Sequence, residues 1–490
     1  MSRKPRKSIL DYFPYESFQL GQRELLLQLE QGVLSHDVIL LICPTAFGKF
    51  AIRRTLAEYI GNVAELLPNN SILEQDLEEQ PLVPKLLSKP YYHCDYCRTV
   101  DREQVRKAVR TKRPFLCNYW SYLANRRRHG ARAGILDKGV ETLLVDEGHK
   151  LVDFNKGLQA EHIWQKEVRY PKNINSSAAL VKWIDEVIRE PDGRSVDVIN
   201  KLTKFRAKLL SGDYIIRKEM GLLRGKHESE ILLLPLNPVL HPACFRGVNR
   251  IVLLSATISQ IDIADLGISK GVRVLQIEAP SPIPVERRPI IKDYVGKLNY
   301  LNQALLAPKL AERIEKYRLK FKHTKGLVHV SYSLAKELHK YLGDNEQYYF
   351  HDSTAESRRG IFNAWKTSKK RGIVFIASGY NEGINLKGAD YGWQGIGKIM
   401  YPSLADLAVK KKSELSPPWY IWNTLKPVMQ SVGRICRGPK DKGVTIVLDG
   451  QFEGLIEKSD KYNLVPKWFK ESIIEDTGTE RALTILEELK

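Results

Sequence analysis

Cysteine is scarce in this sequence, and long apolar segments are absent. Six cysteines are scattered through 490 residues. This density is far below that of small secreted domains built on disulfides, so we expect a reduced protein. No segment approaches the roughly 18 consecutive apolar residues that a membrane-spanning helix requires. The basic residues 1–13 are not followed by the apolar core of a secretory signal. These absences argue against secretion and membrane insertion and predict a cytoplasmic protein.

Acidic residues are too few to balance the basic ones. The chain has 57 Asp and Glu against 77 Lys and Arg, a formal net charge of +20. A positive excess of this size favours a polyanionic partner such as a nucleic acid. With 43% hydrophobic residues the chain can bury sizeable cores, which excludes a largely disordered protein. Its length allows two or three domains.

Short runs of apolar and β-branched residues alternate with helical patterns along most of the chain. Such runs, bounded by turns, are typical of buried parallel strands with helices between them. The six clearest runs are Val38–Ile42, Thr142–Val145, Arg250–Leu254, Gly326–Val330, Ile373–Ala377 and Val444–Leu448. The sequence therefore predicts an α/β fold built on parallel sheets.

Two changes of pattern divide the chain. Residues 151–225 show mainly helical periodicity, which predicts a helical insertion, and a strand-like pattern returns at Glu230–Leu234. The proline-rich segment Ala279–Pro289 interrupts both periodicities and is the predicted linker. The predicted α/β domains are a first one formed by 1–150 and 226–285, with a small insert at about 88–113, and a second one formed by 286–490.

A candidate phosphate-binding loop follows the first predicted strand. The turn after Ile42 ends in Gly48-Lys49 at the start of a helical pattern, which lets backbone N–H groups and one ammonium surround nucleotide phosphates. Phe50 stands where such loops carry the serine or threonine that binds Mg²⁺. The candidate nucleotide-binding residues here are Pro44, Thr45, Ala46, Phe47, Gly48, Lys49 and Phe50. An ordinary strand-to-helix turn is the alternative at this point.

Two carboxylates follow the predicted strand Thr142–Val145. Asp146 and Glu147 emerge at its carboxyl end, where α/β sheets bind their ligands. One carboxylate can hold Mg²⁺ while the next orients or deprotonates a water, as phosphoryl transfer to water requires. A surface turn is the alternative for an isolated acidic pair, but a preceding phosphate loop favours the chemical role.

Together these motifs form an ordered series in which the chain resembles superfamily 2 helicases. Ser255–Thr257 is similar to the coupling motif that follows the fifth strand of the first motor domain. In the second half, residues 326–332, residues 378–386 and the Q-x-x-G-R-x-x-R element Gln430–Arg437 are similar to the remaining motor motifs. The resemblance covers Tyr12–Phe452. It implies two RecA-like α/β motor domains that bind ATP and Mg²⁺ between them.

The resemblance also implies a role for individual residues. Asp146 would bind Mg²⁺, Glu147 would position the attacking water, and Lys49 would hold the β- and γ-phosphates. Gln22 would recognise adenine. Because Phe50 supplies no oxygen, replacing it by threonine is expected to strengthen Mg²⁺ binding. Further residues at the nucleotide would be Gly383, Asn385, Gln430, Arg434 and Arg437. Residues that would hold the nucleic-acid backbone are Asn69, Asn70, Asn118, Tyr119, Ser331 and Ser378.

Within the superfamily the nearest likeness is to the XPD/DinG group. Residues 13–16 followed by Gln22 are similar to its N-terminal motif, and the helical insertion is similar to its arch domain. The group's iron–sulfur cluster needs four cysteines, whereas the corresponding stretch has Cys94 and Cys97. These two could be half a metal site or structural residues. The chain therefore fits relatives without the cluster, including bacteriophage enzymes, whose location would be the host cytoplasm.

The implied function is ATP-driven translocation on nucleic acid, with unwinding of single-stranded or forked DNA as the expected activity. RNA is the alternative substrate. The alternative function, favoured by Phe50, is a non-enzymatic or weakly active nucleic-acid-binding protein on a helicase scaffold. Aromatic residues that could stack bases, with burial in a core as the alternative for each, are Tyr119, Trp120, Tyr122, Trp419 and Trp422.

Overall fold

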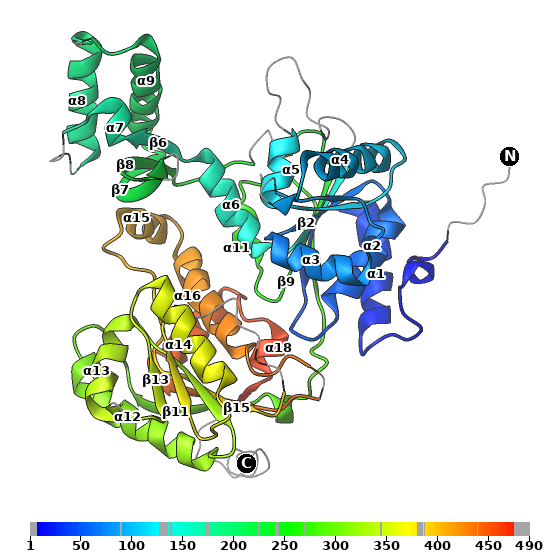
Figure 1. The fold of residues 1–490 in the computed structure, drawn as a ribbon, viewed down its shortest axis with the longest axis vertical. Helices are drawn as coiled ribbons and strands as arrows, with labels where there is room; N and C mark the ends of the chain where they lie inside the picture. The colour runs from blue at the N-terminus through cyan, green and yellow to red at the C-terminus, as the bar shows by residue number, and fades with distance from the viewer. Residues whose placement is uncertain are drawn as a thin grey trace.

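The computed structural model contains two seven-stranded parallel sheets and one three-stranded antiparallel sheet (Figure 1). It describes residues 7–88, 91–126, 136, 140–171, 174, 176–191, 193–223, 226–240, 245–268, 271–343, 345–379, 386, 388–438 and 440–474. Helices flank both parallel sheets, which is the RecA-like arrangement. The predicted fold class is confirmed.

The first parallel sheet has the strand order β10-β1-β9-β5-β2-β4-β3. Its strands are β1 (Val38–Ile42), β2 (Val63–Leu67), β3 (Lys85–Leu86), β4 (Phe115–Asn118), β5 (Thr142–Asp146), β9 (Arg250–Ser255) and β10 (Val274–Glu278). Strands β1, β2 and β5 are buried along their whole length, and β1 is accordingly apolar throughout. Because β9 pairs with both β1 and β5, the loops after these three strands leave the same edge of the sheet side by side.

Helices cover the two faces of the first sheet. They are η1 (Ile9–Tyr12), α1 (Gln22–Ser35), α2 (Lys49–Ile60), α3 (Asn70–Glu79), α4 (Asp95–Arg110), α5 (Tyr119–Arg126), α6 (His149–Gln159) and α11 (Gln260–Asp265). On one face α1 and α2 bury apolar residues such as Leu29 and Leu56. On the other face α5 and α6 bury Tyr122 and Leu151. Two apolar layers therefore hold the loops at the carboxyl edge in place.

The second parallel sheet has the strand order β13-β14-β12-β15-β16-β11-β17. Its strands are β11 (Ile290–Gly296), β12 (Lys325–His329), β13 (Tyr348–Phe350), β14 (Val374–Ala377), β15 (Tyr391–Ile396), β16 (Val444–Asp449) and β17 (Ile473–Ile474). Its helices are η3 (Val285–Arg287), α12 (Gln303–Lys320), α13 (Tyr332–Leu342), α14 (Ala355–Thr367), α15 (Leu407–Leu415), α16 (Pro417–Val432), α17 (Gln451–Lys461) and α18 (Lys467–Lys470). The predicted linker Ala279–Pro289 joins β10 to β11.

The insertion in the first domain is not purely helical. It contains β6 (Glu161–Trp164), α7 (Gln165–Val168), α8 (Ser177–Arg189), α9 (Val196–Leu210), β7 (Tyr214–Leu223) and β8 (Lys226–Pro235). The strands form an antiparallel sheet of order β6-β8-β7. Figure 1 shows it standing away from the first sheet, connected through α6.

The placement predicted for Glu230–Leu234 is wrong, because this segment lies in β8 of the insertion and not in the first domain. Ile231 and Leu233 are buried together with Leu180 and Phe205 of the insertion's own helices. The apolar run therefore serves a separate small core. A run of this length looks the same whichever sheet it joins.

The insertion also contacts the second domain. Nη2 of Arg217, in β7, lies 2.5 Å from Oδ2 of Asp406, the residue that caps α15. Nζ of Lys412, in α15, donates to O of Leu236 at 2.8 Å. The insertion, which belongs to the first domain, is thus also linked to the second domain. None of the helices in the described ranges combines the length and the hydropathy needed to span a bilayer.

Candidate nucleotide-binding cleft

The phosphate loop is a strained turn between β1 and α2. Gly48 caps α2 with a φ of +79°, and Ala46 has a φ of +67°. A Cβ at Gly48 would lie 2.6 Å from Nε2 of Gln22, so this position needs glycine for its conformation and for space. Gln22 is buried; its Nε2 donates to O of Phe47 at 2.7 Å and its Oε1 accepts from N of Gln19 at 2.8 Å. This amide therefore joins the phosphate loop to the segment before α1, and adenine recognition by Gln22 stays a prediction.

Lys49 and Glu147 form an ion pair at the end of the loop. Nζ of Lys49 lies 2.8 Å from Oε1 of Glu147. Burial acts to lower the pKa of Lys49, but the negative charges of Glu147 and Asp146 outweigh it, so this pKa is raised. Burial acts to raise the pKa of Glu147, but the charges of Lys49 and His149 outweigh it and bring it to about 2. The pair is therefore fully charged at neutral pH.

The backbone of Glu147 is held in an unfavourable conformation. Its φ of +49° lies in the left-handed region, which costs a residue with a side chain roughly 1–2 kcal/mol. Its N–H donates to Oδ1 of Asp146 at 3.1 Å. The hydroxyl of Tyr119 donates to O of Asp146 at 2.7 Å. Local strain that is fixed by surrounding hydrogen bonds is common at functional sites.

Asp146 is paired with an arginine that the sequence analysis did not single out. Nη1 of Arg53, in α2, lies 3.2 Å from Oδ2 of Asp146. Asp146 uses its other oxygen for the N–H of Glu147. Cζ of Arg53 lies 5.9 Å from the centre of the Phe50 ring. Mg²⁺ requires a near-octahedral set of oxygen ligands. A ring without an oxygen and a carboxylate already paired with a guanidinium do not fit the Mg²⁺ site that the sequence predicts.

The Q-x-x-G-R-x-x-R element lies at the end of α16 and faces the first domain. Nε2 of Gln430 lies 3.2 Å from Nε2 of His149 and donates to Oγ1 of Thr257 at 3.4 Å. A Cβ at Gly433 would lie 3.1 Å from Oγ1 of Thr45 in the phosphate loop. The second domain is therefore closely packed against the nucleotide-binding loop of the first.

A chain of polar groups crosses from the acidic pair to the second domain. Oγ of Ser255 donates to Oε2 of Glu147 at 3.5 Å and lies 2.8 Å from Nδ1 of His149. The other ring nitrogen of His149 contacts Gln430. Since Ser255 ends β9 and His149 begins α6, three different segments carry the link. The predicted coupling motif Ser255–Thr257 thus lies between the acidic pair and the second domain.

The two arginines of this element lie near the cleft. Arg434 is buried beside His329, whose pKa is lowered to about 3 by burial and then by the charge of Arg434. Nη1 of Arg437 donates to O of Gly433 at 3.3 Å. Burial lowers the pKa of Arg437, while the negative charge of Glu147 acts in the opposite direction. The structure thus brings Arg437 within electrostatic range of Glu147. Gly383 and Asn385, also predicted at the nucleotide, lie outside the described residues.

Two of the six residues predicted to hold nucleic acid cap helices and are at least partly exposed. Oδ1 of Asn69 accepts from N of Ile72 at 3.0 Å at the start of α3, and Asn69 is exposed. Oγ of Ser331 accepts from N of Leu334 at 3.3 Å at the start of α13, and Ser331 is partly exposed. Helix N-termini suit phosphate groups, so these two positions remain compatible with the predicted role.

The other four predicted residues, Asn70, Asn118, Tyr119 and Ser378, are buried. Nδ2 of Asn118 donates to Oδ1 of Asn70 and, at 2.9 Å, to Oγ of Ser88. Asn118 also accepts from N of Ser121 at 2.7 Å. In this conformation Asn70 and Asn118 hold neighbouring loops of the first domain together, and none of the four side chains faces solvent.

Most of the candidate stacking aromatics are also buried. Trp120 is 61% exposed, but Tyr119, Tyr122, Trp419 and Trp422 lie in the core. Nε1 of Trp422 donates to Oδ2 of Asp262 at 2.9 Å, and Nε1 of Trp419 donates to Oδ2 of Asp265 at 2.6 Å. Both acids belong to α11 of the first domain. Sequence analysis missed this contact between α11 and α16, although two tryptophans at i and i+3 share one face of a helix.

Cys94 and Cys97 lie together at the exposed start of α4. Their sulfur atoms are 3.1 Å apart, and the N–H of Cys97 donates to Sγ of Cys94 at 3.3 Å. Within the described ranges, no group of three or more His, Cys, Asp or Glu side chains could hold a metal ion. Cys94 caps α4, and a metal at this pair stays an untested alternative from the sequence.

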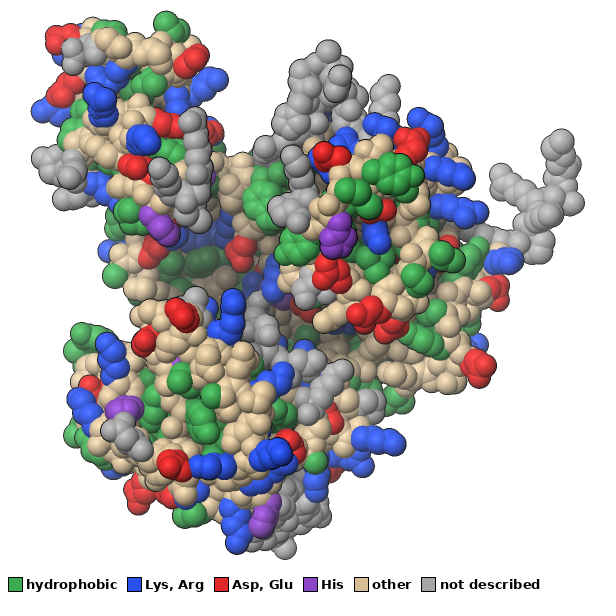
Figure 2. Space-filling model, viewed as in Figure 1, with side chains coloured by type: hydrophobic (Ala, Val, Ile, Leu, Met, Phe, Trp, Pro, Cys, Tyr) green, Lys and Arg blue, Asp and Glu red, His purple; other side chains and the backbone are tan. Residues whose placement is uncertain are grey.

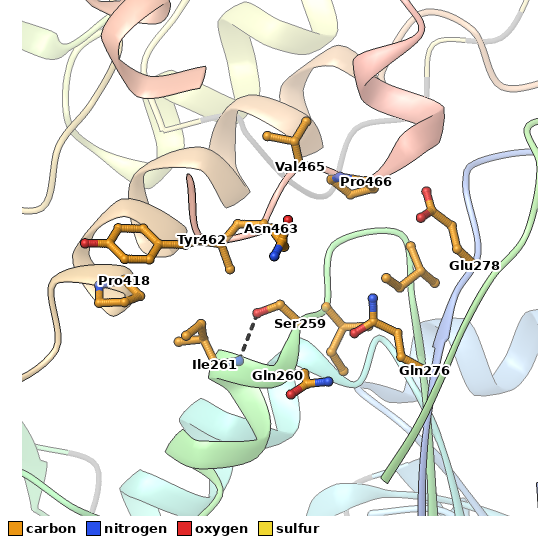
Figure 3. Close-up of a pocket in the computed structure, with 13 residues that line it drawn as sticks. Ser259, Gln260, Ile261, Gln276, Glu278, Pro418, Tyr462, Asn463, Val465 and Pro466 are labelled. Atoms are coloured by element: carbon orange, nitrogen blue, oxygen red, sulfur yellow. Dashed lines mark hydrogen bonds between the residues drawn. The ribbon is translucent and has the colours of Figure 1, made fainter. Parts of the chain in front are cut away.

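A cavity of about 630 Å³ lies between the domains (Figure 3). Residues of β10 line it on one side, and the loop that follows α17 lines the other, as Gln276, Glu278, Tyr462 and Asn463 show. Of the 13 described residues that line it, Glu278 is the one with a charged side chain. A pocket with this lining does not suit phosphates, so we place the candidate site at the Lys49–Glu147 pair.

Basic side chains are spread over the molecule. Figure 2 shows Lys and Arg on all three parts, and a hollow where the insertion, the first domain and the second domain meet. The spread agrees with the net charge of +20. A polyanion could therefore be held by several parts at once.

Comparison with known proteins gives the class of this fold. Residues 317–472 match the helicase C-terminal domain family. No curated protein sequence matches the chain. A structure of XPD in the apo form has 16% sequence identity and a TM-score of 0.56, covering 91% of this chain and 98% of that one. Xpd4 of S. tokodaii has 13% identity and a TM-score of 0.55, covering 93% and 99%.

At these identities the likeness to the two XPD structures is one of fold. The predicted resemblance is thus confirmed in fold, and residues 317–472 carry the match to the helicase C-terminal domain.

Proposed function

We propose that this protein is an ATP-dependent nucleic-acid translocase or helicase that hydrolyses ATP in the cleft between its RecA-like domains. The observation that carries the proposal is the polar chain from Glu147, through Ser255 and His149, to Gln430 of the second domain. Such a chain makes the geometry of the acidic pair depend on the position of the second domain. A motor needs this dependence to link hydrolysis to domain movement.

Nucleotide binding would redistribute the charges around Glu147. In this structure Lys49 is paired with Glu147. The β- and γ-phosphates of ATP would compete for the same ammonium. Losing this partner raises the pKa of Glu147 from its low value, which makes the carboxylate a better acceptor of a proton from the attacking water. The substrate itself would thus activate its base.

The second domain would supply positive charge to the transferred phosphoryl group. Arg437 already lies within electrostatic range of Glu147, and Arg434, three residues earlier in the loop after α16, is buried. If these arginines reach the nucleotide only when the cleft closes, their positive charge stabilises the transition state more than it stabilises the free substrate. Because the residues at Phe50 and Asp146 do not fit a protein-bound Mg²⁺, we assign no step to that ion.

The proposed substrate is single-stranded or forked DNA, with RNA as the competing polymer. A stepping motor must hold phosphates and release bases, so its binding should be weakly selective for sequence and sensitive to salt. The net charge of +20 supports a polyanionic track. The resemblance to the XPD/DinG group favours DNA.

A nucleic-acid-binding protein with little or no hydrolysis is the second candidate. One observation favours it: Phe50 presents a ring where a phosphate loop usually presents a hydroxyl. Against it, Lys49, Glu147 and Gln430 keep a connected arrangement across the cleft, for which binding alone gives no chemical reason.

The test is ATP hydrolysis measured without polymer and then with single-stranded DNA, forked DNA, duplex DNA and RNA. We expect stimulation by nucleic acid, because a polymer that bridges the domains brings Arg437 to the nucleotide. Glu147→Gln, measured in parallel, shows whether the hydrolysis belongs to this site. Equal turnover with every polymer and with none would contradict a motor. Tight nucleic-acid binding without hydrolysis would favour the second candidate.

A further inference from the structure

Arg53 is the centre of a buried cluster of charges beneath the phosphate loop. Its side chain is 3% exposed and contacts three carboxylates from three different elements. Nε lies 3.0 Å from Oε2 of Glu65 in β2, Nη1 lies 3.2 Å from Oδ2 of Asp146 in β5, and Nη2 contacts Asp76 in α3. A guanidinium can do this because its five N–H groups point in fixed directions in one plane.

Arg53 already pairs with the carboxylate of Asp146, to which a metal ion would otherwise bind. Asp146 is the acidic residue at the end of β5 that resembles a Mg²⁺ ligand, yet Oδ2 faces Arg53 and Oδ1 accepts from N of Glu147. A divalent ion bonded to Asp146 would lie next to a buried guanidinium and be repelled by it. Phe50, whose ring lies near the same guanidinium, cannot compensate with an oxygen.

The contacts of Arg53 lead directly to the candidate base. Arg53 holds Asp146, and Asp146 accepts the N–H of Glu147, whose backbone has a φ of +49°. Without an acceptor at this point the strained conformation would lose one of its hydrogen bonds. A metal ion bound to Asp146 would serve the same purpose, because it would also fix this carboxylate.

We propose that Arg53 takes the place of a protein-bound metal ion at this site, so that a nucleotide binds without a bond between protein and metal. Arg53 is a positioning residue that acts through Asp146. Any divalent ion that enters with the nucleotide is held by phosphates and water. This inference rests on the proposed function. The sequence alone led us to expect that Phe50→Thr strengthens Mg²⁺ binding. With Asp146 still paired with Arg53, this substitution alone should not make nucleotide binding depend on Mg²⁺.

The test measures the affinity for a fluorescent ATP analogue, with the methylanthraniloyl group on the ribose, in excess MgCl₂ and in excess EDTA. For the unaltered protein and for Phe50→Thr we expect dissociation constants that differ by less than about threefold between the two media. Tightening by Mg²⁺ of about tenfold or more in the unaltered protein would overturn the inference and leave the proposed function intact. Absence of binding in both media would overturn both.

Variants of Arg53 give a second readout. Phe50→Thr combined with Arg53→Gln supplies a hydroxyl and frees Asp146, so its affinity should become about tenfold or more dependent on Mg²⁺. Phe50→Thr with Arg53→Lys keeps a positive charge and should keep the weak dependence. Arg54→Gln is the control, since Arg54 lies next in α2 and pairs with Glu58 and, at 3.9 Å, with Glu65, whereas Asp146 is held by Arg53. Mg²⁺ dependence that is equal in the Gln and Lys variants would overturn the role of the guanidinium.

Loss of Arg53 leaves Glu65 buried without its main partner and could unfold the domain. Thermal unfolding of each variant is therefore recorded with the binding data. If no Arg53 variant folds, the unaltered protein and Phe50→Thr still decide the question, because neither changes the cluster.

Discussion

The two parallel sheets have the same architecture, but the edges at which the two domains face each other carry charge in different ways. At the first edge, Lys49 and Arg53 are each paired with a carboxylate of the same domain, Glu147 and Asp146. At the second edge, Arg437 donates to a backbone carbonyl of its own domain, while the acid that acts on it electrostatically is Glu147 of the other domain.

Because of this difference, we expect nucleotide binding to depend on the first domain and hydrolysis to depend on both domains. The first edge is complete within one domain, so it can form a nucleotide site without the second. The second edge adds positive charge only where the two domains meet. Hydrolysis should therefore depend on closure of the cleft, whereas nucleotide binding should depend on it much less.

Replacing Arg437 by glutamine should give the largest effect. We expect turnover to fall about a thousandfold while nucleotide affinity changes little, because the arginine acts on charge that develops during phosphoryl transfer. Turnover under saturating ATP and polymer, and affinity in a separate binding experiment, check this. Arg313→Gln is the control, since Arg313 pairs with Asp293 in the same domain. Equal losses in turnover and affinity would mean that Arg437 shapes the site and does not act in the transition state.

Glu147→Gln tests the first edge. The amide keeps the size of the side chain but accepts no proton, so turnover should fall about a hundredfold or more. Affinity for ATP should be kept or increased, because the ammonium of Lys49 is no longer paired with a carboxylate and is available to phosphates. Glu141→Gln, at an exposed carboxylate just before β5 that pairs with Lys112, is the control. Hydrolysis at the original rate would remove Glu147 from the mechanism.

His329 at the end of β12 should make the second domain more sensitive to moderate acid than the first edge. Its folded-state pKa of about 3 lies below the usual value of 6.5, so the unfolded chain takes up a proton that the folded protein excludes. Stability from this group is complete above pH 6.5 and is lost as pH falls toward 3, with a slope of at most about 1.4 kcal/mol per pH unit.

Urea unfolding between pH 7 and pH 5 measures that slope. His329→Gln should reduce it, and His339→Gln, at an exposed residue of α13, should not. Glu147, whose pKa is lowered to about 2 from 4.5, contributes stability that is fully present above pH 4.5. It should therefore add no slope in this range. An unchanged slope in His329→Gln would contradict burial of a neutral imidazole.

Most of the fold could be predicted because parallel strands buried on both faces leave a plain signal. The predicted run Val38–Ile42 coincides with β1, and Arg250–Leu254 differs from β9 by one residue. The antiparallel strands β7 and β8 were not recognised as a pair, since β7 mixes charged and apolar residues on a half-exposed surface. Local pattern does not state which strand pairs with which.

Site residues that belong to short sequence motifs could be predicted. Residues whose role depends on ion pairs between distant parts of the chain were harder to predict. Lys49 and Glu147 were found from motifs and do meet in the structure. Arg53 was missed, although it follows Lys49 by one helical turn and Glu65 is an acid inside an apolar strand, which requires a partner. Of the five aromatic candidates, four are buried, as the alternative of burial in a core expects, since large aromatic side chains are usually buried.

The smallest predicted effect concerns the contact between the two edges. In Gly433→Ala, the new methyl group would lie 3.1 Å from Oγ1 of Thr45, a tight approach between the phosphate loop and α16. We expect stability to be unchanged or slightly higher, because alanine loses less conformational entropy on folding, by roughly 0.5–1 kcal/mol. The KM for ATP should rise a few fold, since closing the cleft then requires Thr45 to move.

Gly360→Ala in α14 is the matched control, as its methyl group meets nothing within 4 Å; it should be stabilised without a change in KM. In the double variant Thr45→Ala/Gly433→Ala the crowding atom is gone, so KM should return to the value of Thr45→Ala alone. If the effects of the two single substitutions on KM simply add, the two edges do not meet in the working protein as they do in this structure. The proposed division between binding at one edge and hydrolysis at the other would then need a different closed arrangement.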